Sequence, residues 1–382
     1  RAGGGGMKIA FYGSSLVSSY WNGAATYYRG IIRALHERGH EITFYEPDAY
    51  DRQQHCDIAE PDWARVVVYP AVEIGAARWV EHAALEADVM VKTSGVGVFD
   101  ELLEKAVAET KREDNITIFW DVDAPATLER MEADPEDSFR ELVPRYDFIL
   151  TYGGGQPVVE GYRDFGAREC VPIYNGIDPT THHPAPADPR FAGALGFLGN
   201  RLPDREARVW EFFLCAAELL PNEQFVLGGS GWEQPALPPN VRHVGHVYSR
   251  EHNAFNCSTR AVLNVNRASM ARYGFSPPTR VFEAAGAGAC LITDAWEGID
   301  LFLRPDEEVL VAQNGEEVAA IVQSLDPERA REIGAAARRR VLAEHTYRHR
   351  AEQFDHVMKG RFETLQDASK APLLSLFAAI TA

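Results

Sequence analysis

The chain has 382 residues, of which 46% are hydrophobic and 25% are charged, and its formal net charge at pH 7 is −18. This length exceeds one typical core and predicts two domains. The negative charge argues against a protein that binds nucleic acid or an anionic membrane, and no apolar run approaches the about 20 residues of a membrane span. The five cysteines are scattered without a CxxC pair, which is typical of reduced thiols and predicts a cytoplasmic protein.

The N-terminal half alternates short apolar strands with helices. Residues 1–6 have the composition of a tag remnant before Met7, and we exclude them from the fold. Strands are expected at 8–12 and 42–45, with an amphipathic helix between them, and this βαβ opening predicts a parallel sheet. Further strands are expected at residues 65–69, 88–92, 116–120 and 147–151. The chain lacks a GxGxxG fingerprint after the first strand, which disfavours a Rossmann dehydrogenase.

Polar or glycine-rich loops follow three of these strands, at residues 93–97, 121–125 and 152–156. In a parallel sheet such loops lie at one edge, where ligands bind. Asp123 could accept a proton from an acceptor hydroxyl or cap a helix, whereas for Asp121 an Asx-type turn is favoured.

Three aromatic residues of this half have two interpretations. Tyr20, Trp21 and Trp120 could stack on a sugar or other planar acceptor, or could belong to the core. Isolated aromatic side chains are more often core residues, and the sequence leaves both possibilities open.

A segment rich in Pro, His, Ala and Asp, at residues 179–189, has no periodicity and is interpreted as a linker. His182 and His183, together with Asp178, suggest a metal site at first sight. Their spacing fits no standard site, so a solvated linker is favoured.

Alternation of strands and helices starts again near residue 190, which predicts a second α/β domain. Strands are expected at residues 194–198, 224–227, 261–265 and 308–312, and helices from residue 315 to the end. The first strand leads into Gly199-Asn200-Arg201, and the second leads into the glycine-rich loop 228–232. Trp232 in that loop could border a ligand or cover the core.

The run from residue 276 to 294 is a loop–helix–strand unit. Ser276 suits a helix N-cap, and the two prolines after it suit a first turn. The N-terminus of such a helix attracts phosphate. Glu283, two turns in, is predicted opposite the apolar stripe, where its carboxylate could accept bonds from two neighbouring hydroxyls such as those of a ribose. The alternative is an ordinary surface Glu.

Together these segments resemble the two-domain GT-B glycosyltransferases of the group 1 type, over nearly the whole chain from Met7. Asn175-Gly176-Ile177-Asp178 resembles the family's crossover between domains, and residues 241–247 resemble the segment that borders the nucleotide base. Residues 282–288 resemble the nucleotide-binding signature Glu-Ala-Met-Ala-x-Gly. Where the family usually has a second Glu, eight positions before Glu283, this chain has Phe275. The run after it is closer to the CgeB-like, spore-maturation-type branch.

The resemblance implies the α/β GT-B fold, with two Rossmann-like, doubly wound parallel-sheet domains facing across a cleft. The expected order is a tag remnant (1–6), an acceptor-binding domain (7–178), a linker (179–190), a nucleotide-sugar-binding domain (191–345) and C-terminal helices (346–382) that could cross back to the first domain.

It also implies a nucleotide-diphosphate-sugar donor, with UDP favoured, and a small-molecule, glycan or protein acceptor, with no cofactor and no metal. Glu283 would accept bonds from the ribose hydroxyls, and Asp123 is the candidate acid–base residue. Arg201 and Arg280 would neutralise the leaving diphosphate, although Arg201 could pair with Asp204 and Arg280 with Glu283 instead. The other donor-binding candidates are Gly199, Asn200, Gly229, His243, Gly245, Phe275, Ser276, Pro277 and Thr279.

Two alternative functions stay open. The missing first Glu favours a catalytically silent GT-B scaffold that binds a nucleotide or glycan, while the retained Glu283 opposes it. A sugar-nucleotide epimerase would need carboxylates and histidines that converge on the sugar, and the sequence alone identifies no such set.

Overall fold

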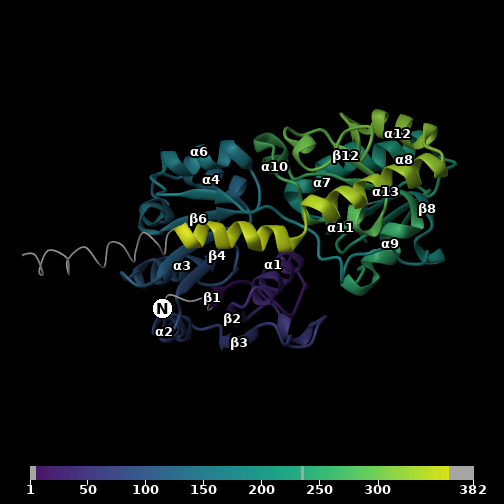
Figure 1. Ribbon diagram of the computed structural model, residues 1–382. Coiled ribbons are helices and arrows are strands. Elements are labelled where there is room, and N and C mark those ends of the chain that lie inside the picture. The colour runs from purple at the N-terminus through teal and green to yellow at the C-terminus, as the bar shows by residue number, and fades with distance from the viewer. Residues whose placement is uncertain (1–5, 234–235, 361–382) are drawn as a thin grey trace, which may run out of the picture.

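The computed structural model describes residues 6–233 and 236–360. Within them the chain forms two α/β domains that lie side by side (Figure 1). The N-terminal sheet has seven strands in the order β3-β2-β1-β4-β5-β6-β7, and the C-terminal sheet has six in the order β10-β9-β8-β11-β12-β13. All neighbouring strands are parallel, which confirms the predicted fold class.

The N-terminal domain follows the alternation that the sequence predicts. Its strands are β1 (Lys8–Tyr12), β2 (Glu41–Asp48), β3 (Arg65–Pro70), β4 (Val89–Thr93), β5 (Ile116–Asp121), β6 (Phe148–Thr151) and β7 (Cys170–Pro172). Its helices are α1 (Ala25–Glu37), α2 (Glu73–Ala84), α3 (Asp100–Glu109), α4 (Ala124–Ala133), α5 (Phe139–Leu142) and α6 (Gly155–Asp164).

The C-terminal domain repeats this plan. Its strands are β8 (Gly193–Leu198), β9 (Phe225–Gly228), β10 (Val241–Gly245), β11 (Thr259–Asn264), β12 (Leu291–Asp294) and β13 (Leu310–Ala312). Its helices are α7 (Pro203–Val209), α8 (Cys215–Leu219), α9 (His252–Ser258), α10 (Ala268–Tyr273), α11 (Thr279–Ala287), α12 (Gly315–Ser324) and α13 (Pro327–Glu344).

In each sheet the direction in which successive strands are added reverses once. The chain builds outward from β1 to β3, then returns to add β4 on the other side of β1; in the same way β11 is added beside β8. Ligands bind at such switch points, outside the carboxyl ends of the strands. The topology therefore directs attention to the loops after β1 and β4 in one domain, and after β8 and β11 in the other.

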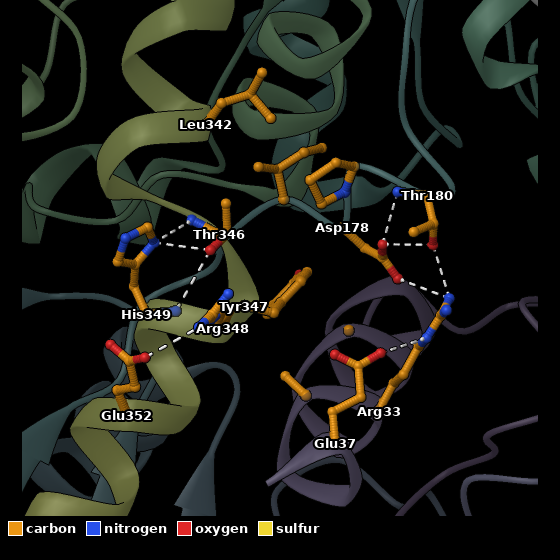
Figure 2. Close-up of a pocket in the computed structure, with 14 residues that line it drawn as sticks. Arg33, Glu37, Asp178, Thr180, Leu342, Thr346, Tyr347, Arg348, His349 and Glu352 are labelled. Carbon is orange, nitrogen blue, oxygen red and sulfur yellow. Dashed lines mark hydrogen bonds and ion pairs between the residues drawn. The ribbon is translucent and has the colours of Figure 1, made fainter.

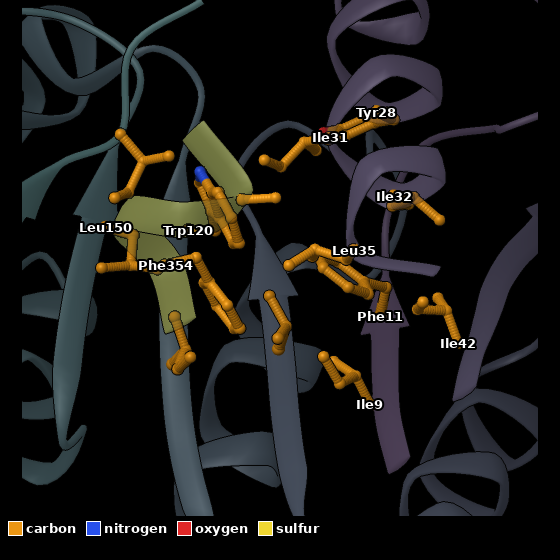
Figure 3. Packing of buried hydrophobic residues seen from close by; sticks show 14 of the residues in the cluster. Ile9, Phe11, Tyr28, Ile31, Ile32, Leu35, Ile42, Trp120, Leu150 and Phe354 are labelled. Atoms are coloured by element: carbon orange, nitrogen blue, oxygen red, sulfur yellow. The ribbon is translucent and has the colours of Figure 1, made fainter. Parts of the chain in front are cut away.

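A helix at residues 347–360 lies against the N-terminal domain, although it follows the C-terminal one (Figure 1). Its Phe354 stacks on Trp120 at a ring-centroid distance of 5.6 Å, within a cluster that includes Phe11 and Leu35 (Figure 3). Trp120 also donates from Nε1 to the Tyr27 hydroxyl at 2.9 Å. Of the two interpretations of Trp120, the structure supports the core residue.

The chain passes between the domains twice, first near Ile177 and again near His345, and the two crossings lie side by side. Ile177 in the first crossing accepts from the Tyr347 N–H and donates to the His345 carbonyl, at 3.1 and 2.9 Å. A Cβ on Gly176 would lie 2.8 Å from the His345 oxygen, so the close approach requires glycine at this position. Residues 361–382 of the expected C-terminal helices and residues 1–5 of the expected tag lie outside the described residues.

The five cysteines, Cys56, Cys170, Cys215, Cys257 and Cys290, are free thiols. In the part of the chain that the structure describes, none of the helices combines the length and apolar character needed to cross a membrane.

Candidate nucleotide-sugar site

Three strand ends of the C-terminal sheet meet through glycines. The Gly199 N–H donates to the Gly228 carbonyl at 2.9 Å, and the Gly229 N–H donates to the Gly245 carbonyl at 2.8 Å. Gly229 has a φ of +124°, and a Cβ there would lie 2.2 Å from the Gly199 oxygen. Only glycine fits at position 229, because the Gly199 backbone occupies the space that a side chain would need.

Side chains fasten the same loops. His243 donates from Nε2 to the Gly229 carbonyl at 2.8 Å, and Asn200 accepts from the Ser230 N–H at 3.0 Å. Trp232 donates from Nε1 to the Gly199 carbonyl at 2.9 Å and is buried in the hydrophobic core. Of its two possible roles, Trp232 therefore covers the core.

Helix α11 starts later than expected. Ser276 donates its hydroxyl to the Gly274 carbonyl at 2.8 Å, and the helix begins at Thr279 with Pro278 as N-cap residue. The prediction that Ser276 caps the helix is wrong, because a residue that precedes a proline is driven out of the helical region, and Pro277 precedes Pro278. The first turn has no side-chain cap and no acidic residue. Its free N–H groups and the helix dipole suit an anion.

Two arginine side chains converge beside this helix terminus. Arg280 donates to the Leu198 carbonyl and to Asn264 Oδ1, both at 2.8 Å, rather than to Glu283. One nitrogen of Arg205 and one of Arg280 each lie 2.9 Å from the position of a Cβ on Gly199. Burial and the neighbouring Arg205 lower the pKa of Arg280 to about 9. Carboxylates lie near both arginines, but among the described residues neither guanidinium forms an ion pair with one. Two cations this close indicate a site for an anion.

Arg205 was missed by the sequence reasoning. Burial, with Arg267 nearby, lowers the pKa of Arg205, and its Nε has no hydrogen-bond partner among the described residues. The available signal was its position in Pro203-Asp204-Arg205. This run forms the first turn of α7, the helix that follows the first strand of the domain.

Arg201, the arginine that the sequence favoured, is less free than Arg205. It pairs with Glu206 at 2.7 Å, so the expected pairing with Asp204 is wrong. Asp204 pairs instead with Arg267.

Glu283 is buried, with only 7% of its surface exposed, so the interpretation as an ordinary surface Glu is wrong. Its two carboxylate oxygens lie 3.9 Å from His182 Nε2 and 3.8 Å from His252 Nδ1. Burial acts to raise the pKa of Glu283, but His182, His252 and Arg280 outweigh it, so the pKa is lowered and the carboxylate is ionised.

The solvated linker predicted around His182 is also wrong at that residue, which is only 6% exposed. Gly286 of α11 explains why: a Cβ there would lie 3.3 Å from the His182 carbonyl oxygen, so glycine lets this segment lie directly on the helix. The neighbouring His183 is exposed, as the prediction for the segment implies.

Asp123 faces the site from the N-terminal domain. Its carboxylate pairs with Arg267, which also pairs with Asp204, so the three charges bridge the domains. Burial raises the pKa of Asp123, and Arg267 opposes that rise. Asp121 accepts from the Asp123 N–H at 2.9 Å, the bond of the predicted Asx-type turn.

Phe275 occupies the position where the resembling family usually has a Glu. Its φ is +46°, a left-handed conformation that is uncommon for a bulky residue. The Phe275 ring occupies the space that a Cβ on Gly155 or Gly298 would need. The backbone carbonyl of Phe275 accepts from the Gly154 N–H at 2.8 Å. The ring thus fills an interdomain contact in place of a carboxylate.

A pocket of about 530 Å³ lies apart from these groups, between α1, the first crossing and helix 347–360 (Figure 2). Its charged side chains bind one another: Arg33 donates to Thr180 Oγ1 at 2.7 Å and pairs with Asp178 at 3.4 Å. None of the predicted site residues lines this pocket. We therefore place the candidate site at the glycine-rich edge instead.

Comparison with known proteins finds one matching family model and several solved structures of similar fold. Residues 205–356 match the family model described as glycosyl transferase-like. Sucrose-phosphate synthase from Thermosynechococcus elongatus matches with a TM-score of 0.70 and 15% identity, over 94% of this chain and 100% of that one.

Two further solved structures match along most of this chain. HepE of Anabaena in complex with UDP and glucose has a TM-score of 0.65 and 13% identity, covering 93% of this chain and 100% of that one. An α-glucosyltransferase in complex with UDP-glucose and DNA has a TM-score of 0.64 and 13% identity, covering 95% and 100%. No curated protein sequence matches significantly. Along its length the chain therefore has the fold of these glycosyltransferase structures, two facing α/β domains with parallel sheets, and residues 205–356 match the glycosyl transferase-like family model.

Proposed function

We propose that this protein transfers a sugar from a UDP-sugar donor to an acceptor held by the N-terminal domain, without a bound metal. One observation carries the proposal: the uncapped start of α11 lies beside the Arg205 and Arg280 guanidinium groups, and the ionised Glu283 lies one turn further along the same helix. This arrangement matches the charges of a nucleoside diphosphate, with an anion at the helix start and hydroxyl groups at the carboxylate.

The two arginines would stabilise the leaving group. When the bond from sugar to diphosphate breaks, negative charge grows on the leaving phosphate. Fixed N–H groups and arginines at that point stabilise the transition state more than the ground state. Arg205 and Arg280 perform this role in our proposal, and Arg201, paired with Glu206, contributes less.

Several features support the choice of donor and its surroundings. UDP or UDP-glucose is named in the HepE and α-glucosyltransferase structures, which share the fold of this chain. Gly199, Gly229, Gly245 and His243 would border the nucleotide, as expected from the resemblance. The five free thiols support a reducing compartment, for which we propose the cytoplasm.

On the acceptor side, we keep Asp123 as the candidate acid–base residue. The raised pKa of this partly buried carboxyl suits proton exchange, but its ion pair with Arg267 has to loosen before the carboxylate can reach a hydroxyl. The run from Phe275 to Glu283 supports a place near the CgeB-like branch, with Phe275 replacing the first Glu.

The test is a calorimetric titration with UDP, GDP, dTDP, ADP and CDP, followed by product analysis with the matching sugar conjugates. We expect UDP to bind, and UDP-sugar to release UDP at an equal rate with and without EDTA. Binding without transfer or hydrolysis would indicate the silent scaffold, and interconversion of sugars with the nucleotide intact would indicate an epimerase. Loss of turnover in EDTA would refute metal independence.

A further inference from the structure

His182, His252 and Glu283 come together from three separate parts of the chain: the segment after Ile177, the start of α9, and α11. One atom from each, an imidazole nitrogen or a carboxylate oxygen, lies within 4.8 Å of the other two. His182 Nε2 and His252 Nδ1 are buried and have no hydrogen-bond partner in residues 6–233 and 236–360. Their distances of 3.9 and 3.8 Å from Glu283 are too long for hydrogen bonds.

In each ring, the hydrogen bond of the nitrogen that points away from Glu283 determines the tautomer of the neutral imidazole. His252 Nε2 lies 3.3 Å from the Val247 carbonyl oxygen, which can only accept, so Nε2 carries the proton. The Thr181 hydroxyl donates to the Asp178 carbonyl at 3.2 Å and therefore accepts from His182 Nδ1 at 3.0 Å. In the neutral form of each ring, the nitrogen that faces Glu283 therefore bears the lone pair. The Thr26 hydroxyl serves the Glu283 carboxylate, but the two histidine nitrogens have no donor of their own among the described residues. Two buried lone pairs beside a carboxylate favour a cation between them.

This arrangement is that of metal-binding histidines. A metal-ligating imidazole donates its other N–H to a carbonyl or similar acceptor, which fixes the tautomer that faces the ion. Two histidines and one carboxylate form a common zinc ligand set that leaves one position open. With Zn–N and Zn–O distances of about 2.0–2.2 Å, an ion between the three atoms would draw them inward by less than about 1 Å.

We propose that His182 Nε2, His252 Nδ1 and Glu283 form a site for a divalent transition-metal ion, with Zn²⁺ the ligand tested first. The sequence-based reading of His182 placed it with Asp178 and His183, whereas its partners lie 70 and 101 positions away in the fold. A second consequence rests on the proposed function: since Glu283 is also the carboxylate for the ribose, bound Zn²⁺ and UDP exclude each other. The ion is then a competitor of the donor and has no part in the transfer.

Zinc binding alone tests the site. The purified chain, stripped with chelator, is titrated with Zn²⁺ by calorimetry and against a chromophoric chelator, and Co²⁺ is added to follow its visible absorption. We expect one ion per chain, with affinity at least 10-fold lower in His182→Ala and His252→Ala and unchanged in His183→Ala, the exposed neighbour. Equal affinity in all four proteins, or no cobalt spectrum in the unsubstituted chain, would overturn the site. The cobalt result does not depend on whether a variant folds.

Competition tests the consequence. Zn²⁺ should weaken UDP binding by the unsubstituted chain, and should weaken it less in His182→Ala and His252→Ala, since chelation of the ion by free UDP affects all proteins equally. UDP binding without zinc binding would leave the proposed function standing and refute the metal site; a loss of UDP affinity in both histidine variants would then assign the rings to the ribose. Zinc binding without UDP binding would do the reverse.

Discussion

The two domains have the same sheet topology, but the edges of the two sheets differ in chemistry. The C-terminal edge presents glycines in mutual contact, two arginines around Gly199 and an uncapped helix terminus. The N-terminal edge presents Asp123 together with two exposed aromatic residues, Trp21 at 51% and Tyr50 at 53% exposure. In our proposal the first edge receives the diphosphate of the donor and the second receives the acceptor. The difference shows that the loops, rather than the shared fold, divide the labour of the proposed reaction.

The aromatic residues of the N-terminal edge are held in place by one buried side chain. Arg52 donates to the Trp21 carbonyl at 3.4 Å and lies over the Tyr50 ring at 4.9 Å from its centroid. Trp21 and Tyr50 both have positive φ, at 48° and 59°, a strained conformation for large residues that is retained mostly at functional sites. Of the two interpretations of Trp21, exposure favours contact with an acceptor over a core position.

Removing a cation from the C-terminal edge should have the largest effect. Arg205→Ala should lower kcat about 100-fold or more, by loss of charge stabilisation on the leaving diphosphate. Steady-state kinetics with UDP-glucose measures this, and Arg163→Ala, a change on α6 in the N-terminal domain, is the control. If kcat is unchanged in a folded Arg205→Ala protein, the anion site is misplaced.

The N-terminal domain should lose stability as the pH rises from acidic to neutral. Burial raises the pKa of Glu104 on α3 to about 7, from 4.5 in the unfolded chain. The native state therefore holds more protons between these values, so stability falls as pH rises from about 4.5 to 7, by about 3 kcal/mol in full. Glu104→Gln should remove this loss. Urea unfolding of both proteins at pH 5 and pH 8 tests it; a stability difference independent of pH would show that Glu104 does not titrate in this way.

Glu283→Gln should weaken UDP binding about 10-fold, because a bond to a charged acceptor contributes about 1.5–3 kcal/mol. Calorimetry measures the affinity, and circular dichroism checks the fold. Gln156→Glu, an exposed change on α6, is a control for surface charge. Unaltered UDP affinity in the folded variant would remove Glu283 from the donor site.

The smallest effect on donor affinity is expected at the N-terminal edge. Asp123→Asn should lower kcat while the Kd for UDP changes less than about 3-fold, because the carboxylate acts on the acceptor side and its bond to Arg267 is retained in part by the amide. Kinetics and calorimetry on one preparation separate the two quantities. A normal kcat would make Asp123 a turn residue, and an equal loss in both would make it a residue of the interdomain contact.

The sequence by itself determined the alternation of strands and helices in both halves. The apolar runs 8–12 and 116–120 form strands that are buried on both faces. Such a run can be recognised from consecutive residues alone. It also placed Gly199 after a strand and Glu283 near a helix start, because apolar strand runs and helix-start residues are local sequence patterns.

Only the tertiary structure decided which side chains meet. His182 looked like a linker residue because its partners, His252 and Glu283, are distant in the chain, and only the space left by Gly286 lets them approach. The sequence did not indicate Arg205, because its proximity to Arg280 at Gly199 leaves no pattern in the neighbouring residues. Burial and electrostatic neighbours are properties of packing between elements, so a pattern read along one element could not supply them.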